Sequence, residues 1–184
     1  MGSLQAQPRG SIETDDVLVE RARAGDEVAF ARLLDLHSRD AVATATGLLG
    51  NRDEAEEAVQ EAFCRAWRKL STLKDRAKFR VWVTGILYRI CCDVQRARGR
   101  TRKAMGALPR EGSADRPDEG AQRVVEEAME LPDEYRGPLV LFYLQQMTVA
   151  ELAEALGISD ENAKVRLHRA RKMLRERLDR KGMR

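Results

Sequence analysis

The 184-residue sequence has few of the residues that build β-sheets. Aromatic residues make up only 5% of it, and Val, Ile and Thr are sparse beside Ala, Leu, Glu and Arg. This balance favours helix over sheet. The length suits one ordinary domain or two small ones. Two small helical domains would each have a small core, so binding of a partner could supply part of their stability.

Cysteine is also scarce. The three cysteines are Cys64, Cys91 and Cys92, an odd number with two of them adjacent, so the sequence indicates no disulfide framework and fits a reducing cytoplasm. The adjacent Cys91 and Cys92 could sense oxidants or bind a metal. Alternatively they are small core residues of a helix, and we favour this second interpretation.

Long apolar segments are missing as well. Residues 1–10 contain no apolar stretch like that of a signal peptide, and the longest apolar run, 138–144, is too short to cross a bilayer. We therefore expect a cytoplasmic protein with no direct membrane insertion.

The motifs of common enzymes are absent too. The sequence has no glycine-rich phosphate loop, no nucleophile motif and no cluster with metal-ligand spacing. His37 and His168 are far apart, and His37 beside Leu36 fits a half-buried helix residue better than a ligand. We predict that the protein is not an enzyme, with no catalytic residue, cofactor or metal.

Charge, in contrast, is plentiful and grouped. Residues 65–110 contain fourteen Lys or Arg and two acids, residues 111–134 contain nine acids and two Arg, and residues 164–184 contain ten bases and two acids. Two basic blocks around an acidic stretch suggest two contacts with a polyanion, although solvated helix faces alone would give the same pattern.

Hydrophobic spacing and capping residues predict an all-α chain. Asp26 can cap a helix through Gly47 that ends at Gly50, and Asn51 can cap the next helix. A basic loop at 71–78 leads to a third helix at about 79–98, and 100–120 reads as a linker. Further helices are expected at 121–131, at 137–146, from Thr148 to Leu156 and from about Asp160.

The last two of these helices have the pattern of a helix-turn-helix. Thr148 can cap the short helix, Gly157 can make the sharp turn, Ile158 fills the angle and Ser159 can cap the long helix. The outer face of the long helix is rich in Lys and Arg, which suits a DNA major groove. An ordinary helical hairpin with a charged outside is the alternative.

Two separated segments together resemble the extracytoplasmic-function (ECF) sigma factors of the sigma-70 family. Region two of that family is matched by 18–26, Ala29-Phe30, 53–67 and Phe79-Arg-Val-Trp82, and region four by 131–136 and 148–174. The resemblance implies two small helical domains joined by a flexible linker. Their expected limits are 14–99 for region two, 100–121 for the linker and 122–184 for region four.

The resemblance implies a transcription initiation factor with three contact faces. Core RNA polymerase, through its clamp helices, would bind Asp53, Glu57, Gln60, Glu61 and Phe63, although Phe63 belongs mainly to the core. The −10 promoter element would meet Lys74, Arg76, Lys78, Arg80 and Arg89. The −35 element would meet Lys164, Val165, Arg166, His168, Arg169, Arg171 and Lys172, with Arg166 and Arg171 serving phosphates or intramolecular pairs.

Some residues around the −10 face depart from the commoner family pattern. Thr84-Gly85 stands where an aromatic residue and Arg are usual, and Arg89 stands where Asn is common. Trp82 could stack on an unpaired base, but its position on the apolar stripe favours core packing.

The implied partners are core RNA polymerase, through its clamp helices and flap, promoter DNA and an anti-sigma factor. An anti-sigma factor in the membrane would hold the protein at that surface. Two other functions remain open: a helix-turn-helix repressor, which would bind duplex DNA without polymerase, and a sigma-like decoy that titrates a regulator. The acidic helix at 53–61 argues against the repressor, and the two complete basic blocks argue against the decoy.

Overall fold

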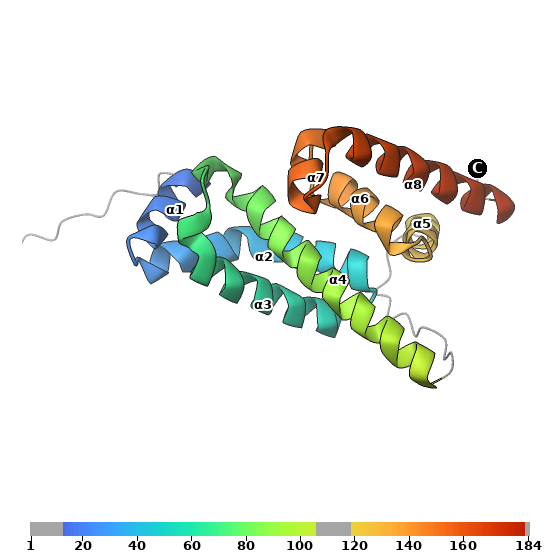
Figure 1. Cartoon of the computed structure of the whole chain (residues 1–184), viewed down its shortest axis with the longest axis horizontal. Helices are drawn as coiled ribbons and strands as arrows, with labels where there is room; N and C mark the ends of the chain where they lie inside the picture. The colour runs from blue at the N-terminus through green and yellow to red at the C-terminus, as the bar shows by residue number, and fades with distance from the viewer. Residues whose placement is uncertain (1–12, 106–118, 183–184) are drawn as a thin grey trace, which may run out of the picture.

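The computed structural model describes residues 13–105 and 119–182. Within these ranges the chain forms eight α-helices and two short 3₁₀ turns and contains no strand, which confirms the predicted all-α class (Figure 1). The helices form two groups. Helices α1 to α4 make the first group, and α5 to α8 make the second.

The first group has the bounds α1 Asp15–Arg23, α2 Glu27–Leu49, α3 Arg52–Lys69 and α4 Phe79–Met105. The predicted caps are present. The Asp26 carboxylate accepts a hydrogen bond from the amide of Ala29 at 3.1 Å, and the Asn51 side chain accepts one from the amide of Glu54 at 3.0 Å. Gly50 ends α2 with a φ of 71°, a conformation that favours glycine.

Aromatic side chains organise the core of this group. Phe79 is fully buried, with its ring centroid 6.5 Å from that of Phe30 and 6.1 Å from that of Trp82. Trp82 packs against the core, as its position on the apolar stripe predicts. Phe63 is also buried, which confirms its expected place in the core.

The second group has the bounds α5 Glu119–Met129, α6 Asp133–Leu144, α7 Val149–Leu156 and α8 Asp160–Arg180. Its last two helices form the predicted helix-turn-helix. Thr148 and Glu151 make a reciprocal capping box at the start of α7. Gly157 turns the chain with a φ of 69°, and the Ser159 hydroxyl accepts a hydrogen bond from the amide of Asn162.

Several element limits differ from the predictions. Helix α4 continues to Met105, past the predicted end near Arg98, and α6 begins at Asp133 instead of Gly137. The predicted loop at 71–78 contains the 3₁₀ turns Leu70–Thr72 and Arg76–Lys78, and α1 was not predicted as a helix. The rest of the predicted linker, 106–118, lies outside the described residues.

The two groups pack directly against each other. Helix α7 lies against α4, and α6 lies between α2 and α8 (Figure 1). Their cores interlock, because Val140 of α6 belongs to the core of the first group and Val81 of α4 belongs to that of the second. The sequence predicted two domains connected by a linker, but it did not predict this contact.

Candidate functional site

The first candidate surface is the acidic face of α3. Asp53, Glu57 and Gln60 are exposed and recur at helical spacing, and Glu61 is half-buried beside them. The buried residues of the same helix, including Ala58, point inward. Three carboxylates and one amide therefore form a stripe that can accept hydrogen bonds from cations of a partner.

Glu61 is already oriented by a neighbour. The Arg65 guanidinium donates a hydrogen bond to it at 2.6 Å and holds the pKa of the Glu61 carboxyl below its ordinary value. Phe63, the remaining residue of this predicted set, is buried and therefore supports the helix from behind. The structure thus brings four of the five predicted residues onto one accessible face.

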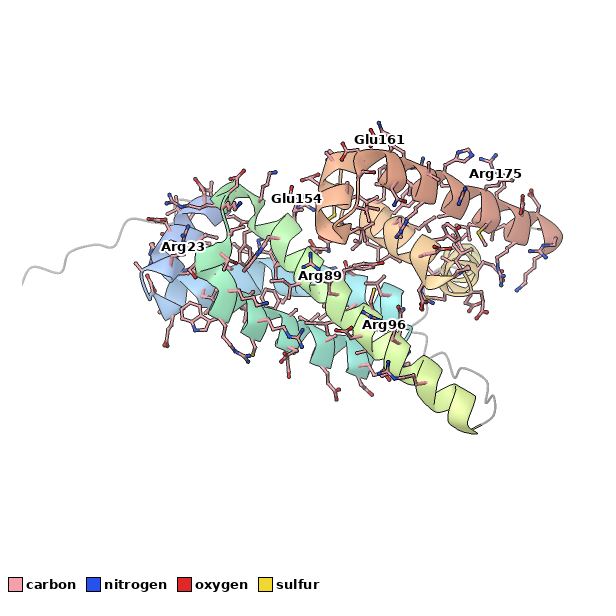
Figure 2. All side chains as sticks on the ribbon, in the orientation of Figure 1. Arg23, Arg89, Arg96, Glu154, Glu161 and Arg175 are labelled. Carbon is pink, nitrogen blue, oxygen red and sulfur yellow. The ribbon has the colours of Figure 1, made fainter. Side chains whose placement is uncertain are left out.

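The second candidate surface runs through the turns before α4 and along that helix. Lys74, Arg76, Lys78 and Arg89 are exposed, and Arg80 is half-buried (Figure 2 labels Arg89). Phe79 anchors the start of α4 in the core, so this helix carries the cations on a well-packed support. Cations in and beside these turns suit a nucleic acid backbone. Arg89 follows Arg80 by nine residues and therefore lies on the opposite side of α4.

Three of these cations are engaged within the chain. Arg76 pairs with Glu20 of α1 at 2.8 Å, Lys78 pairs with Glu154 of α7 at 2.9 Å, and Arg80 pairs with Glu151 of α7 at 3.0 Å. Two of the three partners thus belong to the helix-turn-helix. The sequence did not predict these contacts.

The third candidate surface is the outer face of α8. Lys164, Val165, His168, Arg169 and Lys172 are all exposed and lie within two helical turns, so they form one stripe. Ala163, Leu167 and Ala170 are buried on the opposite side. Figure 2 shows Glu161 and Arg175 on the same outer side of α8, away from α6. This surface has the width and charge of a helix that enters a major groove.

Two arginines of the predicted −35 set make intramolecular contacts. Arg171 lies over the ring of Phe142, 4.9 Å from its centroid, and donates a hydrogen bond to the Tyr143 hydroxyl at 3.0 Å. Arg166 donates to the Asn162 side chain at 3.0 Å. These contacts confirm the intramolecular part of their expected role. The Arg171 contacts join α8 to α6, whereas the Arg166 contact lies within α8.

Sequence reasoning missed the residues that join the two groups of helices. Gln145 is buried between them, and Gly85 of α4 lies against the backbone of α7. The signal was visible at Gly85, since an isolated glycine in an apolar helix often marks a close approach. In the sequence, Gly85 stood out only as a departure from the commoner family pattern.

Other kinds of site find no support in the described ranges. No group of three or more His, Cys, Asp or Glu residues in them is arranged to hold a metal ion. Cys91 is buried, and burial raises the pKa of its thiol to about 12, which leaves it unreactive. Among the same residues, none of the helices is long and apolar enough to span a membrane.

Two family models match successive parts of the chain. Residues 33–101 match the family "Sigma-70 region 2", and residues 121–174 match "Sigma-70, region 4". The chain is 29% identical to the ECF RNA polymerase sigma factor SigW of Bacillus subtilis, over 87% of this chain and 94% of SigW. It is 30% identical to the ECF RNA polymerase sigma factor SigM of Mycobacterium tuberculosis, over 88% of this chain and 83% of SigM.

A solved structure shows the same arrangement of helices. The sigma factor RpoE of Bartonella quintana, crystallised with the anti-sigma factor NepR, superposes with a TM-score of 0.71 at 25% identity. The match covers 82% of this chain and 96% of that one. The fold and the two matching family models define a sigma-70 type initiation factor, and the chain belongs to the ECF sigma factors. It is therefore a transcription initiation factor that directs RNA polymerase to promoters.

Proposed function

We propose that the acidic face of α3 is the main contact with core RNA polymerase. The supporting observation is that Asp53, Glu57 and Gln60 are exposed on one stripe beside Glu61. The clamp helices of the polymerase would supply the matching cations, and the burial of Phe63 gives the stripe a rigid base. Region four would add a second contact, at the flap.

We further propose the division of labour on DNA. Region two, at 14–99, binds the −10 element through Lys74, Arg76, Lys78, Arg80 and Arg89 and captures one strand as the duplex opens. Region four, at 122–184, reads the −35 element with the exposed stripe of α8. Residues 100–121 join the two regions, although α4 carries helix into that segment as far as Met105. Catalysis is left to the polymerase.

An anti-sigma factor is the expected regulator. The Bartonella quintana relative was crystallised with one. We infer that this chain too is held inactive by such a partner in the cytoplasm, where it meets the polymerase, or at the membrane when the partner is embedded there.

Titration of labelled protein with core polymerase tests the α3 assignment. The variant Gln60→Ala with Glu61→Lys should bind at least about tenfold more weakly, a change of ~1.4 kcal/mol. Glu134→Lys is the control, because it alters an exposed acid at the start of α6, away from α3. Circular dichroism should show the same helix content in all three proteins. Equal affinity of the double variant and the wild type would refute the assignment.

A further inference from the structure

The segment between α3 and α4 presents three of the proposed −10 cations on an exposed stretch of backbone. Residues 74–78 are all exposed, and Lys74, Arg76 and Lys78 are among them. The side chains of Leu70 and Leu73 are buried and anchor the first part of the segment in the core. A stretch of backbone this exposed needs further contacts if it is to present its cations in one fixed geometry.

Helix α1 supplies such contacts. Figure 1 shows α1 beside the chain that joins α3 to α4, and the helix lies against both 3₁₀ turns. The guanidinium of Arg23, the last residue of α1, donates one hydrogen bond to the Ser71 carbonyl at 3.2 Å and another to the Leu73 carbonyl at 3.4 Å (Figure 2 labels Arg23). One side chain of α1 therefore joins two backbone positions that lie 48 and 50 residues further along the chain.

A second residue of α1 reaches the other turn. Glu20 lies one helical turn before Arg23 and therefore on the same face of α1. Its carboxylate pairs with the Arg76 guanidinium at 2.8 Å. This pair is exposed and contributes little stability by itself, but it fixes the direction of a cation that is expected to meet DNA. Arg23 thus holds the first turn of the segment, and Glu20 holds the second.

The body of the first helical group fixes α1 itself. The buried residues of this helix are Leu18, Val19 and Ala22. At the corner between α1 and α2, Arg21 donates two hydrogen bonds to the Asp26 carboxylate, at 2.9 and 2.7 Å. The position of Arg23 is therefore set by the core and by this corner, and does not depend on the segment that it holds.

We propose that α1 positions the −10 segment, with Arg23 as the positioning residue. Because its carbonyls at Ser71 and Leu73 are held in advance, the segment does not have to be ordered when it meets the opened DNA strand. A guanidinium suits this task, since its planar fork of N–H groups can serve two acceptors at once. The inference rests on the proposed role of this segment in binding the −10 element, and it extends that role to a helix that lies beside the DNA-binding residues.

Binding of fork-shaped DNA to the holoenzyme, made from core polymerase and the full-length chain, tests the proposal. The matched fork carries a duplex −35 element and the −10 sequence of a mapped promoter as a single strand. The scrambled fork has the same base composition in a different −10 order. The ratio of the two affinities measures recognition of the −10 sequence, and a variant that merely folds less well leaves this ratio unchanged.

Arg23→Ala should bind the matched fork about tenfold more weakly and the scrambled fork as the wild type does, because phosphate contacts remain while sequence capture now includes the ordering of the segment. Arg23→Lys should recover only part of the ratio, since one ammonium cannot replace a two-nitrogen fork. Arg39→Ala is the matched control. It removes the same charge from an exposed position of α2 and should keep the wild-type ratio.

Hydrogen exchange of the free full-length chain measures the positioning without DNA. The Leu73 amide donates to the Leu70 carbonyl at 3.2 Å, and the Lys78 amide donates to the Asp75 carbonyl at 3.1 Å, so these two amides report on the two turns. In Arg23→Ala the Leu73 amide should exchange about tenfold faster than in the wild type. Arg39→Ala should leave its rate unchanged.

The inference is overturned if Arg23→Ala weakens both forks equally or if Arg23→Lys restores the full ratio, since either result would make Arg23 a simple phosphate contact. It is also overturned if Arg23→Ala leaves both the ratio and the exchange rate at wild-type values. Failure of the proposed function is a different result, in which the wild-type holoenzyme binds the two forks equally. The exchange rates would then still decide whether Arg23 holds the segment.

Discussion

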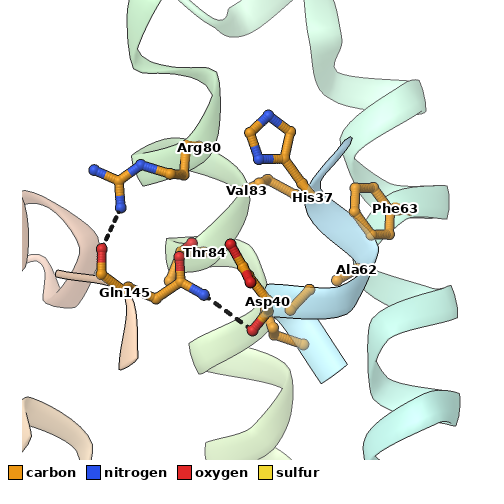
Figure 3. A pocket seen from close by; sticks show the side chains of 10 residues that line it. His37, Asp40, Ala62, Phe63, Arg80, Val83, Thr84 and Gln145 are labelled. Atoms are coloured by element: carbon orange, nitrogen blue, oxygen red, sulfur yellow. Dashed lines mark hydrogen bonds between the residues drawn. The ribbon is translucent and has the colours of Figure 1, made fainter. Parts of the chain in front are cut away.

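Arg80 and Gln145 are 65 residues apart in the sequence, yet the Arg80 guanidinium donates a 2.6 Å hydrogen bond to the Gln145 carbonyl. Gln145 is the C-cap of α6, so a cation from region two lies at the negative end of a region-four helix. A side chain expected to hold DNA therefore also joins region two to region four (Figure 3).

The outer face of α8 should divide base reading from backbone contact. We expect Arg169→Ala to relax preference at one −35 position, at a cost of roughly 1–3 kcal/mol, since Arg169 is on the exposed N-terminal half of the helix. Arg175→Ala should lower activity on every sequence alike and flatten the salt dependence by about one unit. Transcription from a −35 library at two salt concentrations measures both effects. A reversed pattern would show that α8 docks differently.

Glu127 should make the stability of region four dependent on pH. Its buried carboxylate pairs with Lys181 and with Arg177, and the hydrogen bond from Lys181, followed by that from Arg177, holds its pKa below the ordinary value of 4.5. A lowered pKa means that this stabilisation is present above about pH 4.5 and is lost as the pH falls through the folded-state value.

Thermal melting of the wild type and of Glu127→Gln at pH 7 and at pH 3 tests this dependence. The variant should melt at a lower temperature at pH 7, and the difference should shrink at pH 3. An equal difference at both values of pH would show that the ion pairs contribute nothing.

Phe79 is the side chain on which the first helical group depends most. It is fully buried between Phe30 and Trp82, so Phe79→Ala should lower the free energy of unfolding by about 3–5 kcal/mol. Val17→Ala, at an exposed position of α1, should change it by less than about 0.5 kcal/mol. Denaturant unfolding followed by circular dichroism compares the two. A small effect of Phe79→Ala would mean that the core repacks around the gap.

Local signals were enough to predict most of the helices. Asp26, Asn51, Thr148 and Ser159 cap the helices that the sequence assigned to them, because a capping side chain bonds only to the backbone next to it. The helix-turn-helix followed from similar local signals, whereas the residues of the three candidate surfaces were implied by the family resemblance.

The contact between the two groups could not be read from such signals. It depends on Gln145 meeting Asp40 and Thr44, about a hundred residues away, and on the fit of Gly85 against Ala155. A buried polar residue is indistinguishable from an exposed one in a sequence, and nothing local specifies its distant partner. The limits of α4 and α6 were also missed, because helix ends depend on tertiary packing as well as on propensity.

Run-off transcription from genomic DNA fragments with purified core polymerase tests the central claim most directly. The claim is that this chain directs the polymerase to promoters through α3, α4 and α8. With the wild-type protein, RNA 5′ ends should map downstream of a shared pair of −35 and −10 sequences at constant spacing. These transcripts should be absent with core polymerase alone. They should be reduced when the double variant, Gln60→Ala with Glu61→Lys, replaces the wild type. If the protein adds no promoter-specific transcript to those of the core enzyme, the account is contradicted.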